Sequence, residues 1–119
     1  MSIVLSEKES LFTLYTKTSM YQMKVDDYGV LLHTYYGKKT ENFDYSYLIQ
    51  RRDHGFSGNP YQAGNDRTYS LDTLPQEYSC FGSGDYRQSA LSVEYQTAAM
   101  ALELRYKDYE IQQGKYKLP

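Results

Sequence analysis

Residues 21–36 read YQMKVDDYGVLLHTYY, and this stretch decides the fold. In its first part Tyr21, Met23 and Val25 alternate with polar residues, which is the period of a half-buried β-strand with one apolar face. The next four residues, Asp-Asp-Tyr-Gly, are turn formers, and the rest of the stretch is an apolar run. The sequence therefore predicts a β-hairpin.

Strand patterns also lie on both sides of this hairpin. The strand character begins at Leu11, and apolar residues alternate with polar ones again in residues 91–95 and 102–106, which predicts two more strands. Residues 97–103 contain good helix formers without Gly or Pro, and they favour a local helical turn. By contrast, residues 40–84 are rich in Asn, Asp, Gly, Ser and Tyr, and we expect mostly loop there.

The composition agrees with a single β-rich domain. The chain has 119 residues, within the usual size of one domain, and 40% of them are hydrophobic. Fifteen Tyr and four Phe stand beside no Trp, and aromatic residues favour strands over helices. We predict an all-β, antiparallel fold with a loop-rich middle.

Charge and cysteine content argue against several functional classes. The net charge is −2, and the thirteen Lys and Arg are scattered between acids, so no basic surface for nucleic acid or anionic lipid is expected. Cys80 is the only cysteine, which excludes an internal disulfide, and no ligand spacing indicates a metal or other cofactor. No stretch is long and apolar enough to span a membrane, and charges at residues 7–9 interrupt any signal-peptide core, so a cytoplasmic location is expected.

The loop-rich middle holds the polar density that could carry chemistry. Three stretches, residues 51–57, 64–78 and 81–87, mix carboxylates, Arg and aromatic residues. Such a mixture suits a saccharide, because carboxylates and Arg bond hydroxyl groups and an aromatic ring covers the apolar face of a sugar. On composition alone, however, Asp–Arg pairs and Gly-rich turns more often brace loops.

No residue stands out as catalytic from the pattern alone. The middle region offers five carboxylates as candidates for glycoside hydrolysis, and no pair is distinguished by spacing: Asp53, Asp66, Asp72, Glu77 and Asp85. His33 lies in an apolar run and is interpreted as a packed core residue, and His54 has no evident acid–base partner. The sequence Gly82-Ser83-Gly84 is interpreted as a turn, because no Lys follows it as in a phosphate loop.

Six motifs carry a resemblance to a known family over essentially the whole chain. In order they are Tyr35-Tyr36-Gly37-Lys38, Arg52-Asp53-His54-Gly55-Phe56-Ser57, Asp66-Arg67-Thr68, Tyr69-Ser70-Leu71-Asp72-Thr73-Leu74-Pro75-Gln76-Glu77-Tyr78, Gly84-Asp85-Tyr86-Arg87 and Leu104-Arg105-Tyr106-Lys107. Their order and spacing resemble the N-terminal domain of bacterial family 36 α-galactosidases.

The resemblance implies a fold for this chain and a separate domain for catalysis. Residues 1–119 would form one N-terminal antiparallel β-sandwich, a supersandwich of the galactose-mutarotase-like type, in a longer enzyme. A catalytic (β/α)8 barrel would follow, and it is absent from this chain. That barrel would carry both aspartates of a retaining hydrolysis that releases terminal α-linked galactose from sugars such as melibiose and raffinose. The fragment alone is therefore expected to be inactive.

The resemblance also assigns two substrate-binding residues. Asp53 matches the family's sugar-contacting aspartate, and Arg67 matches an Arg from the same loop region. In the family this loop reaches the active site of a neighbouring subunit in a homotetramer. A carboxylate can accept bonds from adjacent galactose hydroxyls, and a nearby Arg can keep it ionised and oriented.

Three departures from the family pattern bear on this expectation. Tyr36 stands where many members have Trp, residues 58–64 vary in length and composition among members, and residues 98–100 replace a polar hairpin turn. The first two affect substrate fit and loop geometry. Two alternative functions remain open from the sequence, namely a stand-alone carbohydrate-binding module and a purely structural β-sandwich whose exposed tyrosines mark an interface.

Overall fold

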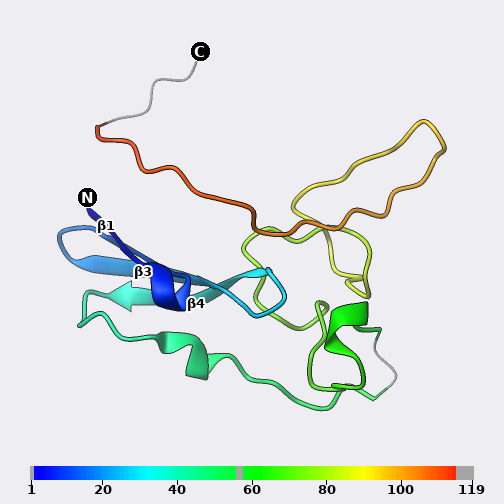
Figure 1. Ribbon diagram of the computed structural model, residues 1–119, viewed down its shortest axis with the longest axis horizontal. Helices are drawn as coiled ribbons and strands as arrows, with labels where there is room; N and C mark the ends of the chain where they lie inside the picture. Colours follow the sequence, from blue (N-terminus) through cyan, green and yellow to red (C-terminus); the bar gives the residue numbers. More distant parts are fainter. Residues whose placement is uncertain (1, 56–57, 115–119) are drawn as a thin grey trace.

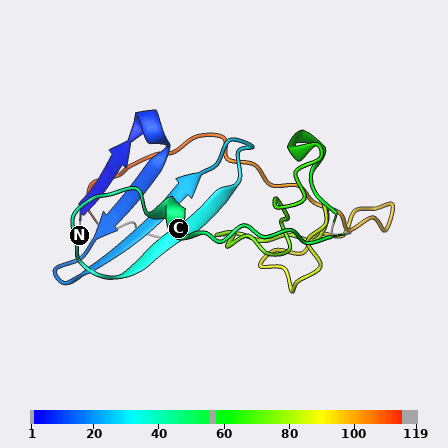
Figure 2. The same cartoon turned by 90° about the horizontal axis from the view of Figure 1, so that it is seen from below.

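The computed structural model describes residues 2–55 and 58–114, and it contains one four-stranded antiparallel sheet. The strands pair in chain order, and three short 3-10 segments accompany them: β1 (Ser2–Ser6), η1 (Glu7–Glu9), β2 (Leu11–Tyr15), β3 (Ser19–Val25), β4 (Leu31–Lys38), η2 (Tyr45–Leu48) and η3 (Tyr61–Ala63). The sheet occupies one side of the molecule and an irregular, loop-rich lobe the other (Figures 1 and 2). The predicted all-β, antiparallel class with a loop-rich middle is confirmed.

The predicted hairpin is strands β3 and β4. Its turn is closed by backbone hydrogen bonds from Asp26 to Val30 and from Gly29 to Asp26, both 3.0 Å long. The Asp26 carboxylate also accepts bonds from the backbone N–H groups of Tyr28 and Val30 at 2.9 Å. Gly29 has φ +78°, a value that glycine adopts without steric cost. The turn chemistry read from the sequence therefore acts as expected.

Strand β1 was missed by the sequence analysis, which began the strand region at Leu11. It pairs along its whole length with β2, with Ser2 opposite Tyr15 and Ser6 opposite Leu11. The charges at residues 7–9 obscured it, because they form the 3-10 connection η1 between the two strands.

The alternation predicted for β3 is present, but the other face is the more deeply buried one. Met20 is 1% exposed and Gln22 is fully buried, whereas Tyr21 and Met23 are only half-buried. The segment before η2, which contains Phe43, therefore covers the face of β3 that carries Gln22, the face that the sequence pattern indicated as polar.

Gln22 tolerates this burial because its amide group is fully bonded. Its Nε2 donates to Thr13 Oγ1 at 3.2 Å and to the Phe43 carbonyl at 2.8 Å. Its Oε1 accepts from Thr34 Oγ1 and from the Tyr45 N–H, both at 3.0 Å. Burial of an amide costs little when its donors and acceptors are paired.

The two later strands predicted at residues 91–95 and 102–106 are not formed. Leu91 makes a single isolated bridge to Cys80. The second segment is tied to its surroundings by separate bonds, from Leu102 N to the Phe81 carbonyl and from Tyr106 N to the Gly29 carbonyl, each 2.8 Å. Among the described residues neither segment has a partner strand, and the alternation therefore produces extended chain without a ladder.

The local helical turn favoured for residues 97–103 is also wrong. The chain reverses there as a tight turn, because Ala98 N donates to the Tyr95 carbonyl at 2.8 Å and Tyr95 N donates to the Ala99 carbonyl at 2.9 Å. Ala98 takes φ +60°, the left-handed conformation that closes this kind of hairpin loop.

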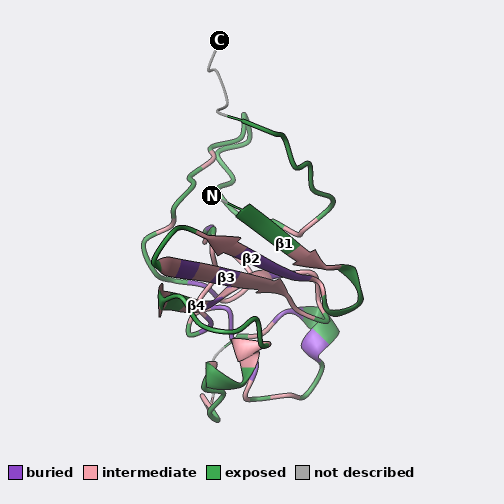
Figure 3. Cartoon of the chain, turned by 90° about the vertical axis from the view of Figure 1, so that its left-hand side faces the viewer, coloured by how far each residue is buried: buried purple, intermediate pink, exposed green. Residues whose placement is uncertain are grey.

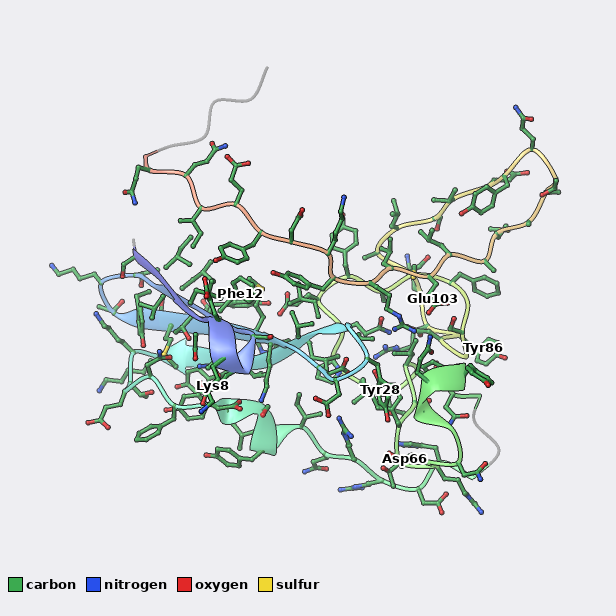
Figure 4. All side chains as sticks on the ribbon, in the orientation of Figure 1. Lys8, Phe12, Tyr28, Asp66, Tyr86 and Glu103 are labelled. Atoms are coloured by element: carbon green, nitrogen blue, oxygen red, sulfur yellow. The ribbon has the colours of Figure 1, made fainter. Side chains whose placement is uncertain are left out.

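The largest buried cluster lies where β4 meets the loop-rich lobe. Its members are Val30, Leu32, Ala63, Tyr69, Leu71 and Leu74. On the opposite face of the sheet, the rings of Tyr106 and Tyr109 lie 5.9 and 5.6 Å from the ring of Phe12, so the C-terminal segment covers part of that face (Figure 4). Buried residues lie in the central strands and in the loop-rich lobe, whereas the C-terminal segment is largely exposed (Figure 3).

His33 is not the packed core residue that the sequence suggested. Its side chain is 34% exposed, and its Nδ1 lies 3.4 Å from Oε1 of Glu77. Tyr21 completes this cluster, since its hydroxyl donates to the same carboxylate at 2.5 Å and its ring lies 5.0 Å from the His33 ring.

Alkaline titration tests this cluster. Burial, followed by the hydrogen bond to Glu77, raises the pKa of Tyr21 from its ordinary value of 10.0 to about 12. Between these values the unfolded chain loses the phenol proton first, so we expect stability to fall as pH rises through this window. Tyr21→Phe should make that fall shallower, as measured by urea unfolding at a series of pH values. An equal slope in both proteins would contradict the assigned contact.

Candidate functional site

The structure brings together Asp53 and Arg67, the two residues that the resemblance assigns to substrate binding. Arg67 Nε lies 3.0 Å from Asp53 Oδ1, and the two segments are also joined by a bond from the His54 N–H to the Arg67 carbonyl at 3.1 Å. The side chains are 57% and 62% exposed for Asp53 and Arg67, respectively. The pair therefore presents a carboxylate at the surface of the loop-rich lobe.

Local backbone geometry orients the Asp53 carboxylate. Its Oδ1 accepts a second bond, from the Gly55 N–H at 2.8 Å, and Gly55 takes φ +64°. This is an Asx turn, in which a short acidic side chain bonds the backbone two residues further along. No hydrogen bond from a described residue reaches Oδ2, which leaves that oxygen able to accept from a ligand. Phe56 and Ser57, part of the same motif, lie outside the described residues.

The Arg67 side of the pair is held by its own turn. The Asp66 carboxylate accepts from the hydroxyl and the N–H of Thr68, at 2.6 and 2.9 Å, and these bonds lower the pKa of Asp66. Asn59 Nδ2 bonds the carbonyls of Gly64 and Asp66, both at 3.1 Å, which ties the preceding loop to this turn. Asp66 lies at the outer end of the lobe (Figure 4).

Tyr69 anchors this turn to the hairpin. The residue is fully buried, its hydroxyl donates to Asp26 Oδ2 at 2.5 Å, and its ring packs edge-on against Tyr28 at 4.6 Å. Burial and the bond to Asp26 raise the pKa of Tyr69. The guanidinium of Arg51 lies over the same ring, 5.3 Å from its centre. The lobe that carries the Asp53–Arg67 pair is thus held to the β3–β4 turn through Tyr69.

A hydrogen-bonded network centred on the buried carboxylate of Asp85 joins other segments of the lobe. Asp85 is 2% exposed and accepts from Gln76 Nε2 at 2.7 Å and from Arg87 Nε at 3.1 Å. Arg87 Nη2 also donates to the carbonyls of Leu71 and Leu74. Here the Asp–Arg pair braces a loop, as composition alone suggested.

The five candidate carboxylates have different hydrogen-bond partners. Besides those of Asp53, Asp66 and Asp85, the carboxylate of Asp72 accepts from the Tyr86 N–H at 3.0 Å and that of Glu77 from Tyr21. Each is engaged by partners within the domain. His54 bonds Thr73 Oγ1 at 3.2 Å, a partner that the sequence did not reveal. The predicted turn at Gly82–Gly84 is present, closed by a bond from Asp85 N to the Gly82 carbonyl.

Two kinds of feature are absent from the part of the chain that the structure describes. Across residues 2–55 and 58–114, no group of three or more His, Cys, Asp or Glu is arranged to hold a metal ion. Within the same ranges no helix is long and apolar enough to cross a membrane.

Arg51 is the site residue that sequence reasoning left unassigned. It was counted only as part of a polar stretch, and its partner Tyr69 lies far along the chain. Tyr36, noted as a departure from the family pattern, is 70% exposed and its ring lies 6.0 Å from that of Tyr21.

Comparison with known proteins gives a consistent result. The family model described as "Glycosyl hydrolase family 36 N-terminal domain" matches residues 29–119. The chain is 51% identical, over 99% of its length, to 12% of the bifunctional alpha-galactosidase/sucrose kinase AgaSK of Mediterraneibacter gnavus. It is 36% identical, over 99% of its length, to 16% of the alpha-galactosidase AgaA of Geobacillus stearothermophilus.

Solved structures show the same relationship. The galactosidase domain of AgaSK superimposes with a TM-score of 0.92 at 50% identity, covering 98% of this chain and 16% of that one. AgaA from Geobacillus stearothermophilus, solved in complex with raffinose, superimposes with a TM-score of 0.82 at 37% identity, covering 91% of this chain and 15% of that one. The chain thus spans 12% to 16% of the length of the curated relatives it matches.

Proposed function

This chain belongs to the glycosyl hydrolase family 36 N-terminal domains, and from that premise we propose that it serves a longer α-galactosidase as a non-catalytic domain. The parent enzyme would release terminal α-linked galactose from sugars of the melibiose and raffinose type. Residues 1–119 would form one N-terminal β-sandwich domain, with hydrolysis carried out by a barrel elsewhere in the parent chain. A cytoplasmic setting is part of the proposal, supported by the single Cys80.

The domain's contribution to activity is proposed to be the Asp53–Arg67 pair. It would complete the substrate site of a neighbouring subunit in a homotetramer. The observation that carries this proposal is the exposed carboxylate, held at 3.0 Å by Arg67 and oriented by the Gly55 N–H. An ion pair this exposed contributes at most about 1 kcal/mol to the free energy of unfolding, so the pair is of little importance for stability.

The chemistry follows from the geometry of the carboxylate. Asp53 Oδ1 is occupied by Arg67 and the backbone, while Oδ2 would accept hydrogen bonds from sugar hydroxyl groups. Bonds to a charged acceptor are stronger than bonds between neutral groups. Binding energy gained at a non-reacting part of the sugar would then help to position the anomeric carbon in the barrel.

The fragment alone is proposed to be inactive. All five candidate carboxylates accept hydrogen bonds from neighbours inside the domain, which suits bracing and binding. Retaining hydrolysis instead needs two carboxyl groups about 5 Å apart that face the scissile bond.

Kinetics of the full-length enzyme test the role of Asp53. We expect Asp53→Ala to lower kcat/KM for raffinose by roughly tenfold to a hundredfold, the worth of one hydrogen bond to a charged group. Asp53→Asn should lose less, because an amide oxygen still accepts one bond. The melting temperature should stay close to that of the wild type.

A matched control is available in a second ion pair, whose carboxylate is also exposed. Arg105 Nη2 lies 2.5 Å from Glu103 Oε1, and the Glu103 side chain is 48% exposed. Glu103→Ala removes a comparable carboxylate from a different part of the surface, and its kcat/KM should equal that of the wild type. Equal kinetics for Asp53→Ala and Glu103→Ala would refute the role of Asp53.

A further inference from the structure

A cavity lies between the β3–β4 turn and the segment that follows η2. Its volume is about 300 Å³, and its apolar lining is Leu32 and Ile49. Tyr47, which is 74% exposed, also lines the cavity. Neither Asp53 nor Arg67 lines this cavity, which shares only Arg51 with the site described above.

The polar groups around the cavity differ in how far they are already satisfied. Lys24 pairs with Asp44, and Asp26 is engaged by the hairpin turn and by Tyr69. Arg51 and Asp27 also line the cavity, and neither has a hydrogen bond to any residue in the described ranges. Both residues are exposed, and the cavity therefore offers the donors of Arg51 and the acceptor of Asp27 without a hydrogen bond inside the described ranges.

Arg51 is nevertheless held in place. Its guanidinium lies 5.3 Å from the centre of the Tyr69 ring, and that ring is fixed by complete burial and by the bond to Asp26. A stacked guanidinium keeps its N–H groups available around its edge. The donor side of the cavity is thus preorganised before any ligand binds.

These features select a class of ligand. An anion would meet the carboxylates of Asp26 and Asp27, and a purely apolar molecule would leave Arg51 and Asp27 without partners. A neutral ring with several hydroxyl groups meets both needs, because each hydroxyl can donate and accept. Its apolar face can lie against an aromatic side chain, here Tyr47. The volume is at the small end for ligand sites, which suits one ring.

We propose that this cavity binds one neutral hexose ring, with Tyr47 against the ring face and Arg51 and Asp27 bonding its hydroxyl groups. The ring could arrive as a free monosaccharide or as one unit of a longer oligosaccharide. Both sources offer the same chemistry to the cavity. The site would give this domain a saccharide contact of its own, which does not depend on Asp53.

The test is an amide-shift titration of the 119-residue chain with galactose and, separately, with raffinose. We expect shifts centred on Lys24, Ser46 and Arg51 for at least one sugar. Shifts with galactose identify free hexose as the ligand, and shifts with raffinose alone identify a unit of an oligosaccharide. Inorganic phosphate, added at the same concentrations, should leave these amides unmoved.

Variants decide whether the cavity itself binds the sugar. Tyr47→Ala and Arg51→Met should each weaken binding by roughly fivefold or more, the loss expected when one ring contact or one bonding group is removed. Tyr61→Ala is the matched control, since Tyr61 is 97% exposed and does not line the cavity. Asp53→Ala should also leave the titration unchanged, which separates this proposal from the role given to Asp53.

Three results would overturn the proposal. They are the absence of shifts around the cavity with either sugar, unaltered affinity in both Tyr47→Ala and Arg51→Met, and phosphate shifts that match or exceed those of the sugars. The dispersed spectrum of each variant shows that its fold is intact, and the exposure of Tyr47 makes loss of folding in Tyr47→Ala unexpected.

Discussion

Asp85→Ala is expected to destabilise the domain by about 3 kcal/mol, the upper end of the range for leaving buried hydrogen-bonding groups without their partner. Asp85 is 2% exposed and accepts bonds from Gln76 and from the side chain of Arg87. Without this carboxylate, the Gln76 amide loses its partner and the partly exposed Arg87 loses its ion pair. Urea unfolding, followed by circular dichroism, measures the change in the free energy of unfolding.

The control for this prediction is an exposed carboxylate. Asp53→Ala removes a carboxylate that also pairs with an Arg but is 57% exposed, and we expect it to cost less than about 1 kcal/mol. A loss below 1 kcal/mol for Asp85→Ala as well would mean that the buried network contributes nothing to stability.

Gly84→Ala is the second large effect expected, at about 3 kcal/mol. Gly84 has φ +88°, and a Cβ built on it would lie 2.4 Å from the carbonyl oxygen of Gly58. The contact is between backbones, so no flexible side chain can move aside. Because Gly58 belongs to the loop beside the Asp53–Arg67 pair, the variant should also lower kcat/KM of the full-length enzyme.

A second glycine isolates the cause of that loss. Gly64 has φ +56°, and no atom lies within 4 Å of a Cβ built on it. Gly64→Ala therefore carries the backbone strain without the clash, and we expect a smaller loss of about 1 kcal/mol in the same unfolding assay. Equal losses in the two variants would show that the close approach of Gly84 to Gly58 is unimportant.

The hairpin could be predicted from the sequence because its determinants are local. The period of residues 21–25 and the turn chemistry of Asp26 and Gly29 act within a few residues of one another. The buried face could not be read in the same way, since Gln22 is satisfied by Phe43 and Tyr45, about twenty residues away. A polar side chain can be buried where hydrogen-bond partners are present, and partners distant in sequence cannot be read from a local pattern.

The prediction of strands at residues 91–95 and 102–106 was wrong for a related reason. Residues 102–106 alternate as a strand does, but a strand exists only when a partner supplies the ladder. In the part of the chain that the structure describes, Leu102 and Tyr106 each bond a different loop, and the segment stays extended without pairing. Alternation leaves both the buried face and the pairing open.

For the candidate site, sequence reasoning reached the residues but not their supports. Asp53 and Arg67 came from the family resemblance, and the structure places them in contact. Their supports are contacts between segments distant in sequence, such as Tyr69 with Asp26 and Arg51 with the Tyr69 ring. No local pattern carries that information.

Mixed oligomers of the full-length enzyme test the central claim most directly. One subunit carries Asp53→Ala with an intact barrel, and the other carries an intact Asp53 with its barrel nucleophile removed. If Asp53 completes the site of a neighbour, the co-assembled enzyme should be clearly more active on raffinose than either variant alone, because the second subunit lends its Asp53 to the first subunit's barrel. Activity no higher than that of the separate variants would contradict the account.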